Sequence, residues 1–343
     1  MRVLDKGGDE DLSRSRVWAI TSYFCFDDPD GVKRRLRVYR EFRRRLQIPL
    51  VAVELSREGA FDLTAADAEV LVQVRGGHVM WQKERLLNRA LEALPDHCDT
   101  VAWMDCDAVL RRQDWAEGAR EMLKEVHLVQ PFDRLYHLKT DTLPGLNSPL
   151  SLLKCLDSVA RRFCQNNLPE AVYRTQGTSV RLGYAPGLVW VASRDLVERY
   201  GLYDAAIVGS GDKVIFSSAC GRCEDVAVAY RMNRRQKEHF DAWARPFSQA
   251  VGGRIGYIEG EAYHLWHGDL ASRRYGTRYE GFEVFEFDPL TDIARNVDGA
   301  WCWSSDKPRM HEFVRQFFQR RREDPTPPRT AALPDEASPA VGL

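Results

Sequence analysis

The stretch Thr100–Leu110, TVAWMDCDAVL, is an apolar run of strand-forming residues that two acids interrupt, Asp105 and Asp107. Carboxylates one residue apart on a strand point to the same side, so these two side chains can converge on one cation. Hard divalent ions prefer oxygen ligands and keep positions for substrate phosphates, and manganese also accepts imidazole. The alternative is a pair of turn carboxylates that cap the next element. The apolar setting favours a metal site, because two buried acids are costly unless something positive neutralises them.

Strand-like and helical segments alternate around this stretch. We expect strands at Val17–Phe26, Pro49–Leu55, Ala68–Val74, Thr100–Leu110, Val126–Phe132 and Ala185–Ser193, and helices over 31–47, Trp81–Leu94, Arg194–Gly201 and 308–322. This alternation predicts βαβ units, and therefore an α/β fold with a mostly parallel central sheet flanked by helices. Ligands of such sheets bind beyond the carboxyl ends of the strands, which is where the two acids fall. The more polar, irregular residues 133–183 are interpreted as a substrate-covering insertion.

Composition narrows the class of protein. The 343 residues carry Lys+Arg 49 against Asp+Glu 50, a formal net charge of −1, so no nucleic-acid partner is expected. No stretch approaches the roughly 18–20 apolar residues of a membrane span, and the charged start lacks the core of a signal peptide. We therefore expect a cytoplasmic protein without a transmembrane segment. The eight cysteines do not suggest a secreted disulfide framework, and the lone CxxC at Cys220 and Cys223 leaves zinc or redox chemistry as a minor alternative.

A second motif, GSGD, covers Gly209 to Asp212. Its glycines, Gly211 among them, let the backbone come close to a ligand, and Asp212 beside them can act as a general base. The simpler interpretation is a helix start, in which Ser210, Gly211 or Asp212 caps the helix that follows. The two interpretations are compatible, since a helix N-terminus is also a favourable place for an anion.

Two further segments supply candidates. In YHLWHGD, Tyr263 to Asp269, either His264 or His267 can provide an imidazole to the metal, although a lone histidine is more often structural. The helix MWQKERLLNRALEAL has a polar first turn, where Gln82, Lys83 and Arg85 can face a nucleotide, although Lys83 and Arg85 can also be plain surface charges.

In this order, MWQKERLLNRALEAL, VAWMDCDAVL, PGLVWVASRDLVERYGLYD and GSGDKVIF resemble the catalytic core of β-1,4-galactosyltransferase-type enzymes. They are also similar to the broader inverting, family-2-like GT-A glycosyltransferases. The resemblance spans roughly residues 17–280. It implies a GT-A fold in which the DxD acids bind Mn²⁺ and the diphosphate of a nucleotide sugar. The segment with Gly187 then lies under the donor sugar, Asp212 is the catalytic base, and a later histidine completes the metal shell.

The sequence also departs from that family. The galactosyltransferase-type motif is richer in acids after its glycines, whereas here Lys213 follows Asp212, which leaves the type of acceptor open. Residues 217–260 lengthen the path from Asp212 to His264 and are interpreted as an insertion. We therefore divide the chain into a lead-in over 1–16 that we expect to be disordered, a catalytic domain over 17–290, a helical extension over 291–324 and a Pro/Ala-rich tail over 325–343 that we also expect to be disordered.

The expected activity is the transfer of a hexose or N-acetylhexosamine from a UDP-sugar to an acceptor hydroxyl on a glycan, small molecule or protein. The cofactor is Mn²⁺ or Mg²⁺, and the reaction inverts the anomeric centre in a bacterial-type enzyme. Thr21 and Tyr23 are expected to line the nucleoside pocket, Tyr23 by stacking on the base. A nucleotidyltransferase of similar fold is one alternative, although its Gly-rich basic loop is replaced here by the acidic FDDPDG. A non-catalytic nucleotide-sugar-binding protein is the other.

Overall fold

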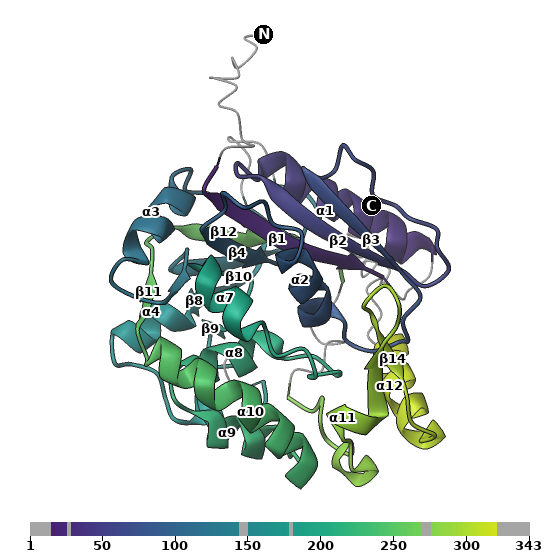
Figure 1. Cartoon of the computed structure of the whole chain (residues 1–343). Coiled ribbons are helices and arrows are strands. Elements are labelled where there is room, and N and C mark those ends of the chain that lie inside the picture. Colours follow the sequence, from purple (N-terminus) through teal and green to yellow (C-terminus); the bar gives the residue numbers. More distant parts are fainter. Residues whose placement is uncertain (1–14, 26–28, 144–149, 178–180, 269–275, 321–343) are drawn as a thin grey trace, which may run out of the picture.

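The central sheet of the computed structural model has seven strands in the order β11-β6-β10-β4-β1-β2-β3 (Figure 1). The structure describes residues 15–25, 29–143, 150–177, 181–268 and 276–320. The strands are β1 (Val17–Phe24), β2 (Leu50–Ser56), β3 (Val70–Arg75), β4 (Thr100–Met104), β6 (Leu128–Gln130), β10 (Val189–Ser193) and β11 (Ile255–Tyr257). Neighbours run parallel except at β10, which is antiparallel to β4 and β6. The predicted α/β class, with a mostly parallel central sheet flanked by helices, is confirmed.

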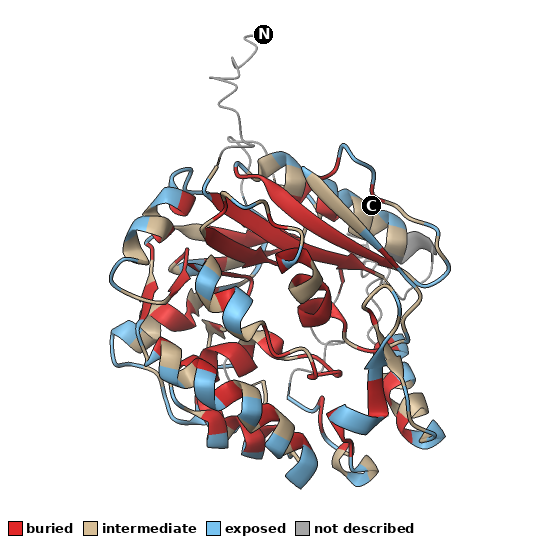
Figure 2. Ribbon diagram, in the orientation of Figure 1, coloured by how far each residue is buried: buried red, intermediate tan, exposed pale blue. Residues whose placement is uncertain are grey.

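Helices cover both faces of this sheet, and its strands are buried between them (Figure 2). Residues of α1 (Pro29–Arg45) and α3 (Trp115–Met122) pack on one face, and those of α2 (Lys83–Leu91), α7 (Arg194–Tyr200) and α8 (Gly211–Ala219) on the other. Successive residues of a strand point to opposite faces. Tyr23 therefore joins the core under α1, whereas Phe24 joins the core that contains α2 and α8.

The predicted strand Thr100–Leu110 is not continuous. It breaks after β4, and β5 (Ala108–Leu110) belongs to a second, five-stranded sheet of order β5-β12-β7-β8-β9. The other strands of this sheet are β7 (Arg134–Leu138), β8 (Leu152–Ser158), β9 (Tyr184–Ala185) and β12 (Glu261–His264). The amide of Asp105 donates to the carbonyl of Leu188 and its own carbonyl accepts from Ala108, which closes a turn. Asp105 and Asp107 thus lie where the chain crosses from one sheet to the other.

The segments interpreted as insertions are more ordered than expected. Residues 133–183 were expected to be irregular but contribute β7 and β8 to the second sheet, followed by α4 (Val159–Cys164) and α5 (Ala171–Arg174). Within 217–260, α9 (Cys223–Ala229) and α10 (Arg234–Val251) pack beside α8, and β11 is an edge strand of the central sheet. Both segments therefore help to build the core around the site.

The C-terminal part, which was expected to be helical, also contains a β-hairpin. After the short η3 (Glu283–Phe285) and α11 (Pro289–Asp292), β13 (Ile293–Arg295) pairs with β14 (Trp301–Trp303), and α12 (Pro308–Arg320) follows. Met310, Val314 and Phe318 of α12 are buried in the same cluster as Tyr203 and Phe240. The predicted lead-in lies almost wholly outside the described residues, and the predicted tail lies entirely outside them. None of the described helices is both long and apolar enough to cross a membrane.

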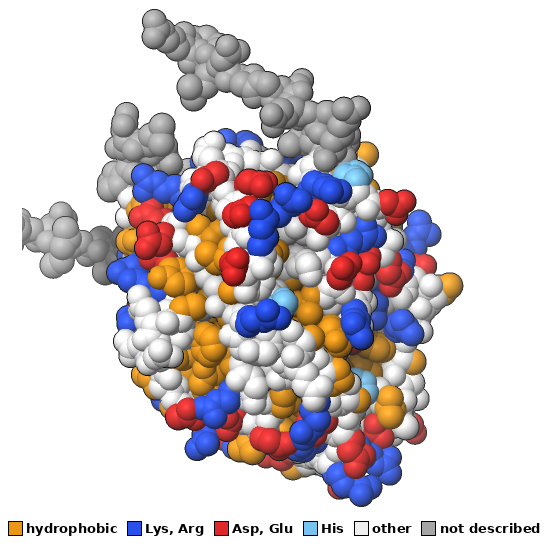
Figure 3. Space-filling model, turned by 60° about the vertical axis from the view of Figure 1, so that its left-hand side comes forward, with side chains coloured by type: hydrophobic (Ala, Val, Ile, Leu, Met, Phe, Trp, Pro, Cys, Tyr) orange, Lys and Arg blue, Asp and Glu red, His pale blue; other side chains and the backbone are white. Residues whose placement is uncertain are grey.

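Charged side chains of both signs are interspersed on the face shown in Figure 3. Several charged side chains of the protein form exposed pairs, such as Lys124 and Glu121, whose Nζ and Oε2 lie 2.6 Å apart. Exposed pairs of this kind are worth about 0–1 kcal/mol each. The fold therefore depends on its apolar cores, and the buried charges described next need a separate explanation.

Candidate active site

A pocket opens at the carboxyl ends of β1 and β4, the position that an open α/β sheet favours for ligands. Ser22 and Phe24 line it from β1, Asp105 and Asp107 from the turn after β4, and Asp212 from the first turn of α8. The start of α2 and the late histidine pair line the same cavity, so all four motifs singled out in the sequence meet there.

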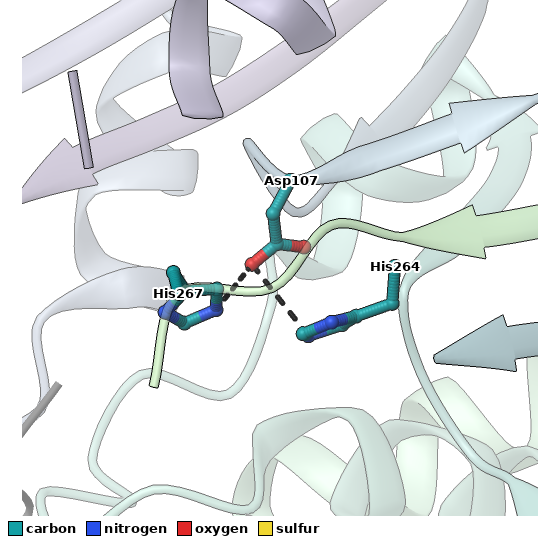
Figure 4. A group of neighbouring side chains, drawn as sticks. All are labelled: Asp107, His264 and His267. Carbon is teal, nitrogen blue, oxygen red and sulfur yellow. Dashed lines mark ion pairs between the residues drawn. The ribbon is translucent and has the colours of Figure 1, made fainter. Parts of the chain in front are cut away.

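Asp107, His264 and His267 form a buried group in this pocket, and their candidate ligand atoms all lie within 4.8 Å of one another (Figure 4). Nε2 of His267 is 2.7 Å from Oδ2 of Asp107, and Nε2 of His264 is 3.7 Å from the same oxygen. Sheet pairing creates this arrangement, because His264 on β12 is opposite Ala108 on β5. The amide of Leu265 also donates to the carbonyl of Asp107 at 3.0 Å.

One carboxylate oxygen and two imidazole nitrogens are a donor set that suits Mn²⁺, since manganese accepts both oxygen and nitrogen ligands. All three residues are less than a tenth exposed, so they are not surface groups gathered by chance. Among the described residues, no other set of three such side chains comes together in this way. The residues present therefore fit the metal ion that the sequence predicts, and both histidines, rather than one, face the carboxylate.

Asp105, the first acid of the motif, lies outside this group. Its Oδ1 is 2.5 Å from Nζ of Lys83, and the same nitrogen is 3.0 and 3.1 Å from the two carboxylate oxygens of Asp212. The turn after β4 thus sends the two carboxylates to different partners, and ligation of the metal by Asp105 beside Asp107 stays a prediction. Lys83 does line the pocket, as predicted, but in this structure it binds two carboxylates of the protein itself.

Burial and charge oppose each other in this cluster. Burial alone lowers the pKa of Lys83, but the neighbouring carboxylates Asp105 and Asp212 hold it well above its usual value. Burial raises the pKa of Asp105 to about 6, against the attraction of Lys83 and with the repulsion of Asp212 and Asp107. Burial likewise raises the pKa of Glu84, the next residue of α2, to about 8. One ammonium group thus faces three acids, and the third stays protonated at neutral pH.

Two glycines make room for the carboxylates of Asp212 and Glu84. A Cβ atom at Gly187 would clash with the carboxylate of Asp212, and one at Gly211 would clash with that of Glu84. Gly187 lines the pocket because only a bare backbone fits beside Asp212. Ser210, with φ 82°, precedes α8 in the left-handed region and its side chain does not cap the helix. The capping interpretation of this motif is therefore not supported for Ser210.

Thr21, Tyr23 and Gln82, which were expected to bind the nucleotide, do not line the pocket. The hydroxyl of Thr21 donates to the carbonyl of Met104 at 2.8 Å and is fully buried. Tyr23 is 1% exposed and packs edge-on against Tyr39, so its ring cannot stack on a base. The prediction had the wrong strand face: Ser22 and Phe24 reach the pocket instead.

Gln82 is also corrected. Its side-chain amide donates to the carbonyls of His78 and Trp301 and accepts from the amide of Trp301, with distances of 3.2, 2.9 and 3.0 Å. It is fully buried and links the start of α2 to β14. Its neighbour Trp81, by contrast, lines the pocket beside Phe24, at 5.7 Å between ring centroids.

Three pocket residues escaped the sequence analysis as site residues. His137 on β7 is in register with His264 on β12, and their rings are 4.6 Å apart. Only the pairing of the second sheet, which the sequence does not reveal, brings it there. Lys213 and Arg278 also line the pocket and are buried. Lys213 had a signal in the sequence, since it follows the predicted base where an acid was expected.

Comparison with known proteins gives distant matches. No family model and no curated protein matches this sequence. Among solved structures, Drosophila β-1,4-galactosyltransferase 7 with manganese, UDP-Gal and xylobiose is 8% identical, with 88% of this chain and 99% of that chain covered and a TM-score of 0.35. A Pyrobaculum calidifontis mannosyltransferase with GDP-Man and Mn²⁺ is 16% identical, with 69% and 73% covered and a TM-score of 0.32. 4-Diphosphocytidyl-2C-methyl-D-erythritol synthase from Anaerococcus prevotii is 10% identical, with 73% and 89% covered and a TM-score of 0.32. These scores are too low to support an argument about function.

Proposed function

We propose that this chain is a metal-dependent glycosyltransferase of the GT-A type. It moves a hexose or N-acetylhexosamine from a UDP-sugar to an acceptor hydroxyl and inverts the anomeric centre. The observation that supports the proposal is a single pocket that joins a buried Asp–His–His group to a separately held carboxylate. A metal site and a positioned base are the two parts that transfer from a nucleotide diphosphate needs.

The donor end of the site is the Asp107 group. Asp107, His264 and His267 would hold Mn²⁺, which when bound neutralises charge on the departing diphosphate. Phe24 and Trp81 offer aromatic surfaces in the same pocket, and these take over the nucleoside-stacking role that Tyr23 cannot fill. The donor sugar then lies towards Gly187 and Asp212, where the bare backbone of Gly187 lets the Asp212 carboxylate come close.

The acceptor end is Asp212. Lys83 binds both of its carboxylate oxygens and so fixes the orientation of the group. The acceptor oxygen forms its bond to the anomeric carbon while the bond from that carbon to the diphosphate oxygen breaks. The acceptor's proton passes to Asp212. Such a positioned base contributes about 10²–10⁴-fold to a reaction of this kind.

The test is the variant Asp212→Asn, assayed against a panel of UDP-, GDP-, CMP- and TDP-sugars with and without Mn²⁺. The wild type should gain thermal stability from a UDP-sugar only when Mn²⁺ is present, and NMR of its product should show the inverted anomer. Asp212→Asn should keep the stabilisation and lose turnover by about 10²-fold or more. Asp62→Asn, which changes an acid outside the pocket, is the matched control. Full turnover in Asp212→Asn, or stabilisation without metal, would contradict the proposal.

A further inference from the structure

Lys213 is a buried cation that the proposed reaction does not use. It follows Asp212 on α8 and lines the pocket, yet the residue is only 5% exposed. Its Nζ donates to the carbonyl of Thr175 at 2.6 Å and lies 5.7 Å from the centre of the Tyr230 ring. Within the described part of the chain, no carboxylate lies within ion-pair distance of this ammonium group.

Such a charge is costly to the fold. Burial lowers the pKa of Lys213 to about 8, and no neighbouring acid offsets that effect. At neutral pH the side chain is still positive, so the folded protein keeps an ammonium group that water would solvate better. A buried, poorly compensated charge in a cleft is typical of a functional site rather than of a structural one.

A second buried cation lines the same pocket. Arg278 is 4% exposed and also lines the pocket, with its Nη1 3.5 Å from Oγ of Ser210. The same nitrogen would lie 2.7 Å from a Cβ atom at Gly209, so the glycine gives it room. The N-terminus of the nine-residue helix α8 adds positive potential on this side. Lys213, Arg278 and this helix end together form what we call the basic wall of the pocket.

The basic wall lies next to the proposed base. Asp212 and Lys213 are consecutive residues in the first turn of α8, and Arg278 reaches Ser210, the residue just before that helix. The three residues of the metal group come instead from the turn after β4 and from β12 and the residues that follow it. The wall therefore belongs to the end of the pocket that holds Asp212. Since the donor's diphosphate is assigned to the metal end, the wall faces the acceptor.

We infer that the acceptor carries an anionic group, a carboxylate or a phosphate, which Lys213 and Arg278 hold while Asp212 takes the proton from a nearby hydroxyl. The inference rests on the proposed function and names the substrate class for the same site. An ammonium and a guanidinium group in one cavity match either anion by charge-assisted hydrogen bonds. A uronic acid and a sugar phosphate are the two sources of this chemistry.

The experiment uses pairs of acceptors that differ only in charge, with the UDP-sugar found in the donor screen. One pair is glucose and glucuronate, and the other is N-acetylglucosamine and its 6-phosphate. We expect kcat/KM, and affinity in calorimetry with the Mn²⁺- and UDP-loaded protein, to favour one anionic member by about tenfold or more. The pair with the larger charged-to-neutral ratio of kcat/KM shows whether the anionic group is a carboxylate or a phosphate. Lys213→Met should bring that ratio close to one, whereas Lys124→Met, which removes an exposed lysine elsewhere, should keep it.

Two results would overturn the inference. One is an equal response to the charged and neutral members of both pairs, in turnover and in binding. The other is a loss of UDP-sugar affinity in Lys213→Met with an unchanged acceptor ratio, since the wall would then serve the donor. Failure of the proposed function looks different: the wild type would show no Mn²⁺-dependent response to any nucleotide sugar. A melting temperature of Lys213→Met at or above that of the wild type shows that the variant is folded.

Discussion

Asp105 and Asp107 are two residues apart, are the same side chain and line the same pocket, yet they lie in opposite electrostatic settings. Asp105 is held by the ammonium group of Lys83, which also binds Asp212. Asp107 faces two imidazoles, His264 and His267, and these are neutral donors unless they are protonated. Asp105 is already paired with a cation of the protein, Lys83. Asp107 lies among two imidazoles that can bind a metal cation together with it. The two acids of this DxD motif are therefore not equivalent, because each has different partners.

The largest effect should come from removing the acid on the metal side. Asp107→Asn deletes the carboxylate charge from the Asp–His–His group, so Mn²⁺ affinity should fall by about 100-fold or more. Asp105→Asn should weaken it by less than about tenfold, since Lys83 already neutralises that acid. Titration of free Mn²⁺ by electron paramagnetic resonance measures both. Equal losses in the two variants would mean that both acids ligate, and the contrast between them would disappear.

Disrupting the cluster of Lys83, Asp105 and Asp212 should lower the stability of the fold and not the affinity for Mn²⁺. Lys83→Met leaves Asp105 and Asp212 facing each other without a cation, and removing one partner of a buried pair costs about 3 kcal/mol. Urea denaturation of the metal-free protein gives the free energy of unfolding. Adding Asp212→Asn to Lys83→Met should recover part of the loss, because one of the stranded charges is gone. Lys237→Met, in an exposed pair on α10, serves as the control and should change stability by less than about 0.5 kcal/mol.

A third acid, Glu84, lies near Lys83 but is not kept ionised by it. Glu84 is buried, and its pKa rises from 4.5 to about 8 in the folded protein. Between these values the folded state binds more protons than the unfolded state, so the free energy of unfolding should fall as pH rises from about 4.5 to 8. Glu84→Gln keeps the shape and removes the titration, which should flatten this dependence by up to about 1.4 kcal/mol per pH unit. Parallel pH profiles for wild type and variant would show that Glu84 is already ionised in the fold.

The sequence predicted the members of the site better than their partners. Asp107, Asp212 and the two histidines, which the structure brings into one pocket, stood out because carboxylates after an apolar strand, an acid beside glycines and paired histidines are unusual locally. The face of β1 was assigned wrongly at Thr21 and Tyr23, because a strand buried on both faces has no polar alternation to fix its parity. The pairing of β7 with β12, which brings His137 to His264, depends on contacts between segments far apart in the chain. Local pattern cannot supply such contacts.

The two buried lysines also differ in whether the protein supplies a charged partner. Removing the one without such a partner, Lys213, gives the smallest expected effect on the free energy of unfolding. Lys83 has two carboxylate partners and a raised pKa, whereas Lys213 has no carboxylate of the described residues within ion-pair distance and a pKa lowered from 10.5 to about 8. Between these last two values the unfolded state binds more protons, so the free energy of unfolding should rise as pH increases from about 8 to 10.5. Lys213→Met should remove that rise and stabilise the protein at pH 7 by about 1 kcal/mol, because an apolar side chain of similar length replaces a poorly compensated charge. Urea denaturation at pH 7 and at pH 10 tests both effects. A loss of stability at pH 7 would mean that the ammonium group has a structural partner, and Lys213 would then belong with Lys83 among the charges that hold the fold together.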